Sequence, residues 1–354
     1  MVSIFSHTQL SFKQALFSLF GKGKQHAASL YSEWFRAGSL QGEWAEPQAQ
    51  GLVKKMISAI DCSLPQQIRE HEEGEISKFL LQFSDQLISE SVLIPMESGI
   101  TLCISSQIGC AMGCAFCETG KMGLLRHLSC CEIVQQAFWA RFVLKKRIRN
   151  IVFMGMGEPF DNFDEVRRAV EILTDEGGFG LGKSRITLST SGRVDGIYRM
   201  INEMDPAVNL AVSVNAPNDE VRQKIMPINR TWNMEQLKEA MRAYCAHPRR
   251  EIFVEYVLIQ GVNDKVEDAD QLALYLQGLR VKVNLIPYNP QKRDRFMPPD
   301  ETHREAFLQR MRGHGFHTLL RGTKGQKIMA ACGQLGDVDW RRQYVTIPSR
   351  KREG

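Results

Sequence analysis

The sequence has no apolar run of the roughly 18 residues that a membrane-spanning helix needs. Its start, MVSIFSHTQLSFKQALF, also lacks the basic segment and the continuous apolar segment of a secretory signal. Neither sign of charge dominates, because 45 lysines and arginines against 40 aspartates and glutamates leave a net charge of only +5. We therefore expect a cytoplasmic protein without membrane contact, whose charge permits a polyanionic partner but does not argue for one.

Internal repeats and low-complexity tracts are also missing from the chain. Hydrophobic residues make up 43% and charged residues 24%, as in ordinary globular proteins, so collagen-like, disordered and coiled-coil proteins are excluded. At about 150 residues per domain, the 354 residues predict two domains, or one large domain with an appendage.

The hydrophobic period changes along the chain. Up to about residue 85, apolar residues three and four apart predict helices, and the segment from Ser77 to Pro95 changes to short strand-like runs. Beyond a domain junction near residues 95–99, strand-like runs alternate with helical patterns, which is typical of βα units around a parallel sheet. Six or seven units predict a full or partly open barrel with its chemistry at the carboxyl ends of the strands. The strands are expected at 100–106, 150–156, 185–191, 208–214, 252–259, 281–287 and 317–321, and helices at 131–144, 164–173, 234–244, 266–279 and 302–312.

The nine cysteines are unevenly distributed, with four of them between residues 103 and 117. In a chain without an export signal, thiols bind metals or take part in catalysis more often than they form structural bridges. Cys110, Cys114 and Cys117 form a C-x3-C-x2-C arrangement directly after the first strand of the predicted barrel. A 4Fe–4S cluster normally takes four cysteines, so three would leave one iron free to bind a substrate. The alternatives are three buried thiols without metal, or structural zinc with Cys103 as the fourth ligand.

The spacing of these cysteines, with the aromatic Phe116 just before the last one, resembles that of the radical S-adenosylmethionine (SAM) superfamily. The resemblance implies that the open iron binds the amino and carboxylate groups of SAM, and that the reduced cluster cleaves SAM to a 5′-deoxyadenosyl radical. It also implies an α/β fold, a partial (β/α)6 radical SAM barrel, which the alternation of strands and helices supports independently.

Further motifs, from about Glu90 to Leu335, narrow the resemblance to the RlmN/Cfr family of radical SAM RNA methyltransferases. The family implies methylation of a ring carbon of adenine in RNA, carbon 2 in preference to carbon 8, through a methyl-cysteine intermediate and two SAM molecules. The substrate expected is 23S ribosomal RNA, with tRNA as a further possibility. The motifs are Gly155-Met-Gly157-Glu158-Pro159, Leu188-Ser-Thr-Ser-Gly192, Ser213-Val-Asn-Ala-Pro-Asn-Asp219, Met226-Pro-Ile-Asn229, Asn284-Leu-Ile-Pro-Tyr-Asn-Pro290 and Ala330-Ala-Cys-Gly-Gln-Leu335.

Three residues take catalytic roles through this resemblance. Cys332 carries the methyl group, Cys103 is the thiol that resolves the intermediate by forming a disulfide, and Glu90 accepts a proton. The residue types suit these roles, because a thiolate attacks sulfur and a carboxylate near an aromatic carbon takes up a proton. Taken alone, Cys103 would be a buried small hydrophobe and Glu90 an exposed carboxylate. The remaining cysteines are assigned to packing: Cys62, Cys130, Cys131 and Cys245.

The resemblance also places contacts to SAM at the ends of the predicted strands. Asn215 stands where the family commonly has histidine, so a hydrogen bond is kept but a titrating ring is not. Glu118 stands where the family usually has a small residue, and we expect its side chain to point away from the cluster. The residues expected to contact SAM are Gly157, Glu158, Ser189, Ser213, Val214, Asn215 and Asn289.

The expected organisation is a small, mainly helical N-terminal accessory domain that binds RNA (1–95), a radical SAM core (96–340) and a basic tail (341–354). The expected partners are RNA and an electron donor such as flavodoxin or ferredoxin, and we expect a monomer. Two other functions stay open, a radical SAM enzyme that acts on protein and a non-catalytic RNA-binding protein stabilised by zinc or a cluster. Basic groups that either line a phosphate track or are ordinary solvated residues are Lys145-Lys146-Arg147, Arg149, Arg249-Arg250 and Lys292-Arg293.

Overall fold

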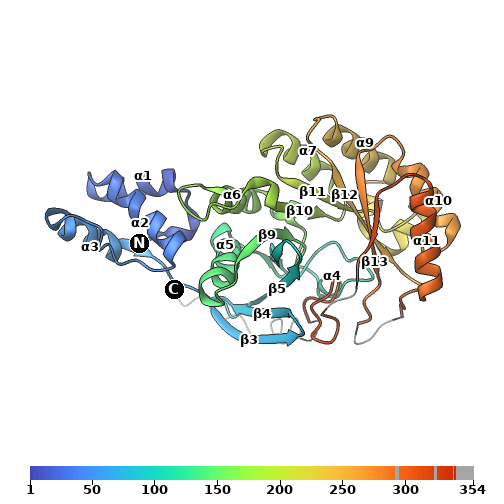
Figure 1. The fold of residues 1–354 in the computed structure, drawn as a ribbon, viewed down its shortest axis with the longest axis horizontal. Coiled ribbons are helices and arrows are strands. Elements are labelled where there is room, and N and C mark those ends of the chain that lie inside the picture. Colours follow the sequence, from blue (N-terminus) through green and yellow to red (C-terminus); the bar gives the residue numbers. More distant parts are fainter. Residues whose placement is uncertain (292–294, 323–324, 338, 340–354) are drawn as a thin grey trace, which may run out of the picture.

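The structure, a computed structural model, describes residues 1–291, 295–322, 325–337 and 339. A helical lobe lies at one end of the long axis of the molecule, and an α/β body with a large twisted sheet makes up the rest (Figure 1). In the described part of the chain, no helix is both long and apolar enough to cross a membrane.

The body is built on one ten-stranded sheet. Its strands are β3 (Gln66–Glu73), β4 (Ile76–Gln82), β5 (Ile88–Met96), β6 (Gly99–Cys103), β9 (Ile148–Phe153), β10 (Ile186–Thr190), β11 (Asn209–Ser213), β12 (Ile252–Leu258), β13 (Val281–Pro287) and β14 (Thr318–Leu320). Their order across the sheet is β14-β13-β12-β11-β10-β9-β6-β5-β4-β3. Neighbours from β14 to β6 are parallel, whereas β6, β5, β4 and β3 pair in antiparallel fashion. Two short ladders join β1 (Val2–Ser3) to β2 (Ile60–Asp61) and β7 (Gln107–Ile108) to β8 (Arg126–His127).

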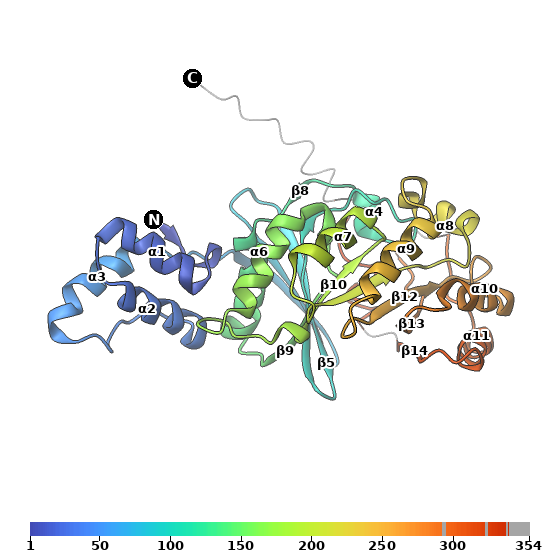
Figure 2. The same cartoon turned by 90° about the horizontal axis from the view of Figure 1, so that it is seen from above.

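Helices connect the parallel strands and pack against one another in neighbouring pairs, α5 with α6, α7 with α9 and α10 with α11 (Figures 1 and 2). The bounds are α1 (Gln9–Phe20), α2 (Lys24–Ala37), α3 (Gln50–Ala59), α4 (Glu118–Met122), α5 (Cys130–Phe138), α6 (Phe163–Thr174), α7 (Val194–Glu203), α8 (Asp219–Ile225), α9 (Met234–Cys245), α10 (Val266–Leu276) and α11 (Glu301–Gly313). In α7 the buried positions Val194, Ile197 and Met200 are three residues apart, which gives the helix one apolar stripe toward the sheet.

All seven strands expected between residues 100 and 321 are present, and the fold predicted from the resemblance is confirmed. The helix expected at 131–144 consists of α5 and a π-helical turn at residues 139–143. The expectation of helices up to residue 85 is wrong after Ala59, because β2 and β3 follow, whereas the strand-like runs expected between Ser77 and Pro95 are present as β4 and β5. Strand β3 has no fully buried residue and carries mostly polar side chains, so it lacks the apolar alternation that predicts a strand.

The stretch around residue 97, where the sequence suggests a domain junction, is a β-hairpin. Strand β5 pairs with β6 across it, with Met96 opposite Gly99 and Val92 opposite Cys103. The strands that precede the junction therefore extend the same sheet as the barrel strands that follow. The division at residue 95 stays a prediction about domains, and the tail at 341–354 lies outside the described residues.

Aromatic side chains attach the helical lobe to the body. The Trp34 ring of α2 stacks on Phe138 of α5 at 4.7 Å between centroids, and Phe5 meets Phe138 edge-on at 5.1 Å. All three side chains are buried. Thr8 caps the start of helix α1, and its hydroxyl accepts from the Ser11 amide. A buried aromatic contact of this kind fixes the lobe against α5, beside the base of the loop that carries the clustered cysteines.

Candidate active site

One cavity lies at the carboxyl ends of the barrel strands and collects most of the residues selected from the sequence. Every parallel strand from β9 to β13, or the loop after it, contributes to the lining. The predicted residues that line it are Cys110, Cys114, Cys117, Gly157, Glu158, Ser189, Ser213, Asn215 and Cys332. Four predicted residues, Cys103, Glu90, Val214 and Asn289, lie outside this lining.

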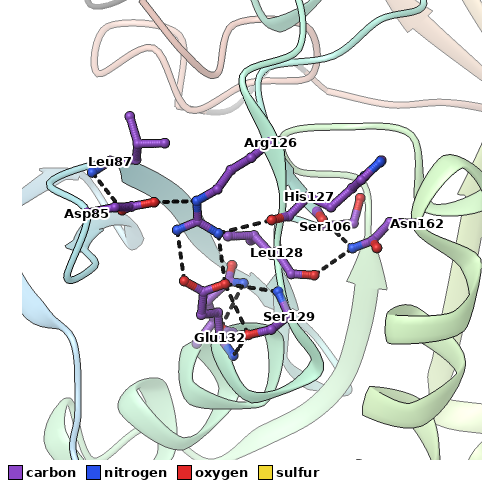
Figure 3. Close-up of polar contacts among 10 residues, drawn as sticks. Asp85, Leu87, Ser106, Arg126, His127, Leu128, Ser129, Glu132 and Asn162 are labelled. Carbon is purple, nitrogen blue, oxygen red and sulfur yellow. Dashed lines mark hydrogen bonds and ion pairs between the residues drawn. The ribbon is translucent and has the colours of Figure 1, made fainter. Parts of the chain in front are cut away.

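The loop that carries the three cysteines is closed at its base by the β7–β8 ladder. Asn162 donates to the carbonyls of Ser106 (2.9 Å) and Leu128 (2.7 Å), one on each side of the loop. Arg126 binds the Glu132 carboxylate through two hydrogen bonds of 2.8 and 2.9 Å and also pairs with Asp85, in the turn between β4 and β5 (Figure 3). The loop is therefore tied both to α5 and to the antiparallel part of the sheet.

A glycine permits the narrow neck of this loop. Gly109 has φ +77°, and a Cβ at this position would lie 1.9 Å from the Gly123 carbonyl oxygen. Farther along the loop, the Glu118 carboxylate forms an ion pair with Lys121 at 3.5 Å. The charge that this departure from the family pattern adds beside the cysteines is thus balanced within α4.

The chemistry of the three thiols fits a soft metal centre. Burial raises the pKa of Cys110, Cys114 and Cys117, that of Cys114 to about 12. The thiols also raise one another's pKa, and a bound cationic metal relieves this by binding them as thiolates. An all-sulfur donor set suits an iron–sulfur cluster or zinc, not a hard cation. Within the described residues, no three or more Cys, His, Asp and Glu side chains lie close enough together to surround one metal ion.

Gly157 and Glu158 form a sharp turn after β9. Gly157 has φ +105°, and a Cβ there would lie 2.6 Å from the Gln107 side chain. The buried Glu158 carboxylate accepts from the Ser191 amide (2.7 Å), the Ser191 hydroxyl (2.8 Å) and the Phe160 amide (3.1 Å). Burial raises the pKa of Glu158, and the hydrogen bonds from Ser191 and Phe160 counteract this. The result is a carboxylate held at the cavity wall, an acceptor suited to an ammonium group.

The neighbouring strands bring hydroxyl and amide groups to the cavity. Ser189 and Ser213 line it, whereas Val214 is fully buried in the core. Asn215 has φ +57°, and its side-chain oxygen accepts from the Val257 amide at 2.8 Å. Asparagine and histidine are both enriched in this left-handed conformation, so asparagine in place of the family's histidine preserves the backbone shape.

Arg222 supports this side of the cavity from behind, and the sequence analysis did not identify it. It is fully buried, and its guanidinium donates to the carbonyls of Ser191 (2.6 Å), Ser213 (3.1 Å) and Val214 (3.1 Å) and to the Asn229 side chain (3.0 Å). One side chain thereby joins the ends of β10 and β11. In the sequence it sits in a short charged helix, which predicts only a solvated arginine.

Residues 327–337, called the Cys332 segment below, contain no helix or strand. Side chains from other parts of the chain hold this segment. The Asn289 amide donates to the Cys332 carbonyl at 3.0 Å, and the Gln291 amide donates to the Gly333 carbonyl at 3.0 Å. Cys332 itself is exposed and lines the cavity. Asn289, expected to contact SAM, therefore contacts the segment that carries Cys332 and lines a second cavity on the far side of it.

Cys103 and Glu90 border the Cys332 segment from the sheet. Burial raises the pKa of Cys103 above its usual range, and the neighbouring Cys332 thiol raises it further. Glu90 is 3% exposed, so the expectation from residue type alone, an exposed carboxylate, is wrong. Its carboxylate pairs with Lys78 at 3.3 Å, and all nine cysteines, Cys103 included, are free thiols.

A buried carboxylate that the sequence did not single out, Glu255, faces the same cavity from β12. It accepts from the Asn284 amide at 2.8 Å, and the Arg321 guanidinium lies 3.8 Å away. Burial raises the pKa of Glu255 and Arg321 lowers it. A glutamate in an otherwise apolar strand is a signal that could have identified it.

The basic residues that could line a phosphate track differ in their burial. Arg250 is buried, donates to the Ile201 carbonyl at 3.3 Å and lies 4.8 Å from the Tyr244 ring centroid, so it has a structural role. Lys145, Arg147, Arg149 and Arg249 are exposed. Lys292 and Arg293 lie outside the described residues.

Comparison with known proteins agrees with this geometry. A family model described as the radical SAM superfamily matches residues 104–273. A probable dual-specificity RNA methyltransferase RlmN 1 of Protochlamydia amoebophila is 53% identical over 98% of this chain and 97% of its own length. The dual-specificity RNA methyltransferase RlmN of Syntrophobacter fumaroxidans is 44% identical over 75% of this chain and 78% of its own. The crystal structure of a radical SAM methyltransferase from Sphaerobacter thermophilus superposes with a TM-score of 0.87 at 35% identity, covering 94% of this chain and 99% of that one.

These similarities confirm the family expected from the motifs and set aside both alternatives, the protein-modifying enzyme and the non-catalytic RNA-binding protein. The relative from Protochlamydia and the structure from Sphaerobacter both extend over the helical lobe as well as the barrel. The chain therefore belongs to the RlmN family of dual-specificity RNA methyltransferases, within the radical SAM superfamily.

Proposed function

We propose that this protein methylates carbon 2 of an adenine in 23S ribosomal RNA and in tRNA, in two stages that meet at Cys332. One observation carries the proposal: Cys332 lines the same cavity as the three clustered cysteines, and Cys103 lies beside it in the sheet. An aromatic ring carbon of adenine is not a nucleophile, so a methyl carrier next to a radical source answers the chemical problem.

A 4Fe–4S cluster and SAM are the cofactors of this superfamily, and when bound they supply a radical that removes a hydrogen atom from a methyl group. We propose that Cys110, Cys114 and Cys117 hold the cluster. Glu158 accepts hydrogen bonds from the ammonium group of SAM, and Ser189, Ser213 and Asn215 offer hydroxyl and amide groups to its other polar atoms.

In the first stage, the Cys332 thiolate receives a methyl group from one SAM molecule in an ordinary displacement. After the activated methylene group has joined the adenine, Glu90 accepts the proton that leaves the ring carbon, and the unpaired electron of the adduct would return to the oxidised cluster, so that a closed-shell adduct remains. The Cys103 thiolate attacks the Cys332 sulfur, an S–S bond forms as the S–C bond breaks, and the electron pair stays with the methylene carbon, which gains a proton. An external reductant returns the disulfide to two thiols.

The partners follow from this chemistry. RNA is the substrate, and a flavodoxin or ferredoxin in the cytoplasm would supply the electrons to a monomeric enzyme. The exposed residues Lys145, Arg147 and Arg149, at and just before the start of β9, are candidate contacts for the RNA backbone.

The test is anaerobic reconstitution with iron, sulfide, SAM, a reductant and RNA, followed by mass spectrometry of the digested RNA. We expect S-adenosylhomocysteine and 5′-deoxyadenosine in an RNA-dependent reaction, and 2-methyladenosine in the product. Formation of only one of the two SAM products contradicts the two-stage scheme, and 8-methyladenosine contradicts the assignment of the carbon.

A further inference from the structure

The antiparallel part of the sheet contains a buried ion pair. Lys78 of β4 and Glu90 of β5 approach to 3.3 Å, and their side chains are only 7% and 4% exposed. Removing two charges from water is costly, and the attraction between them offsets this only when further polar contacts complete the arrangement. Lysine is almost never buried this deeply unless it is paired, so the contacts of Lys78 call for an explanation.

Those further contacts all go to the segment that carries Cys332. The Lys78 ammonium donates to the Met329 carbonyl at 3.1 Å, three residues before Cys332. The Gly336 amide donates to the Glu90 carboxylate, four residues after Cys332. One member of the ion pair thus holds each end of the segment.

The backbone of the segment has an unfavourable conformation at one residue, so contacts from outside are needed to stabilise it. Met329 has φ +52°, which is unusual for a residue other than glycine, asparagine or aspartate. At the start of the segment, the Glu73 carboxylate of β3 accepts from the Lys327 amide at 2.8 Å. Strands β3, β4 and β5 therefore each contribute one polar side chain to the same irregular stretch of chain.

We infer that Lys78 is a positioning residue that keeps Glu90 as a carboxylate and binds the Met329 end of the Cys332 segment. It thereby holds the proton acceptor Glu90 and the methyl carrier Cys332 in fixed positions relative to each other. This inference rests on the roles proposed above for Glu90 and Cys332. It assigns the antiparallel extension of the barrel a part in the second half of the reaction.

Two charged groups face the Glu90 carboxylate, Lys78 from β4 and Asp337 from the end of the Cys332 segment. Burial raises the pKa of Glu90, Lys78 and the Gly336 amide lower it, and Asp337 raises it. A proton acceptor must be ionised, so its activity is lost as the pH falls through its pKa. Removing the Lys78 charge raises that pKa further and therefore moves the loss of activity to higher pH.

The experiment follows the RNA–protein adduct in reconstituted enzyme, from pH 6 to pH 9, on denaturing gels and by product analysis. In Lys78→Met we expect the adduct to decay about tenfold more slowly at pH 7, with the acid limb of the decay rate shifted up by about one pH unit. Lys78→Gln keeps a donor for Met329 without the charge and should show the same shift. Lys78→Arg should keep the wild-type profile.

The matched control is Lys183→Met, which removes a lysine from an exposed ion pair with Asp205 just before β10. It should leave both the adduct and its pH profile unchanged. Equal losses in Lys78→Met and Lys78→Arg at every pH, or an unshifted profile in Lys78→Met and Lys78→Gln, overturn the inference. If Lys78→Met does not fold, the pH profile of Lys78→Gln tests the inference in its place. Failure of the wild type to methylate Cys332 or to form an adduct contradicts the proposed function instead.

Discussion

The cysteine loop and the Cys332 segment meet in one cavity but are held in different ways. The loop is closed by pairing between its own two ends, β7 and β8, and the side chains of Arg126 and Asn162 reinforce this ladder. The Cys332 segment is held by residues more than 40 positions away, among them Asn289 and Lys78. A metal loop must keep three sulfurs in fixed positions, whereas a methyl carrier has to meet SAM, RNA and Cys103 in turn.

The largest effects are expected when one sulfur is removed from each region. Cys114→Ala should abolish 5′-deoxyadenosine formation and lower the iron content, while the chain stays folded because a small buried side chain is lost. Cys332→Ala should abolish RNA methylation and leave the iron content unchanged. Iron analysis and chromatography of the SAM products measure both.

The control for this pair is Cys130→Ala, a buried cysteine of α5 that does not line the cavity. It should retain iron and both SAM products. If Cys114→Ala still forms 5′-deoxyadenosine, the assignment of the cluster to the loop is wrong.

A smaller effect is expected from Asn289→Ala, which removes the hydrogen bond to the Cys332 carbonyl. A hydrogen bond of this kind contributes about 1 kcal/mol, so methyl transfer to Cys332 should slow by about fivefold. Mass spectrometry of the intact protein follows the added methyl group over time. Asn209→Ala loses a comparable bond to the Ser184 carbonyl at the opposite end of the barrel and should keep the wild-type rate.

The smallest effect is expected from Arg126→Ala at the base of the cysteine loop. Its ion pairs are partly exposed, so their loss should lower the free energy of unfolding by about 1 kcal/mol and Tm by a few degrees. Differential scanning calorimetry of the iron-free protein measures this. Retention of iron at the wild-type level alongside that drop would show that β7 and β8 suffice to close the loop.

The difference between local and long-range contacts also explains which features could be predicted from the sequence. The cysteine loop was identified from spacing alone, since the three thiols lie within eight residues. Arg222 and Lys78 were missed because each is a charged residue whose burial depends on strands far away in the sequence. Strand β3 was missed for a related reason, because its side chains are almost all polar and its pairing with β4 is not visible in a single segment.

The order of motifs along the chain determined the family, the cofactors and the βα succession, because short spacings and local hydrophobic period are properties of the chain itself. Only the tertiary structure decided that Cys332 faces the cysteine loop, that Cys103 lies beside it, and that a lysine–glutamate pair holds both ends of its segment. Such contacts arise because the sheet brings β4 and β5 against the segment that carries Cys332, and burial then changes the ionisation of groups whose sequence neighbours give no sign of it.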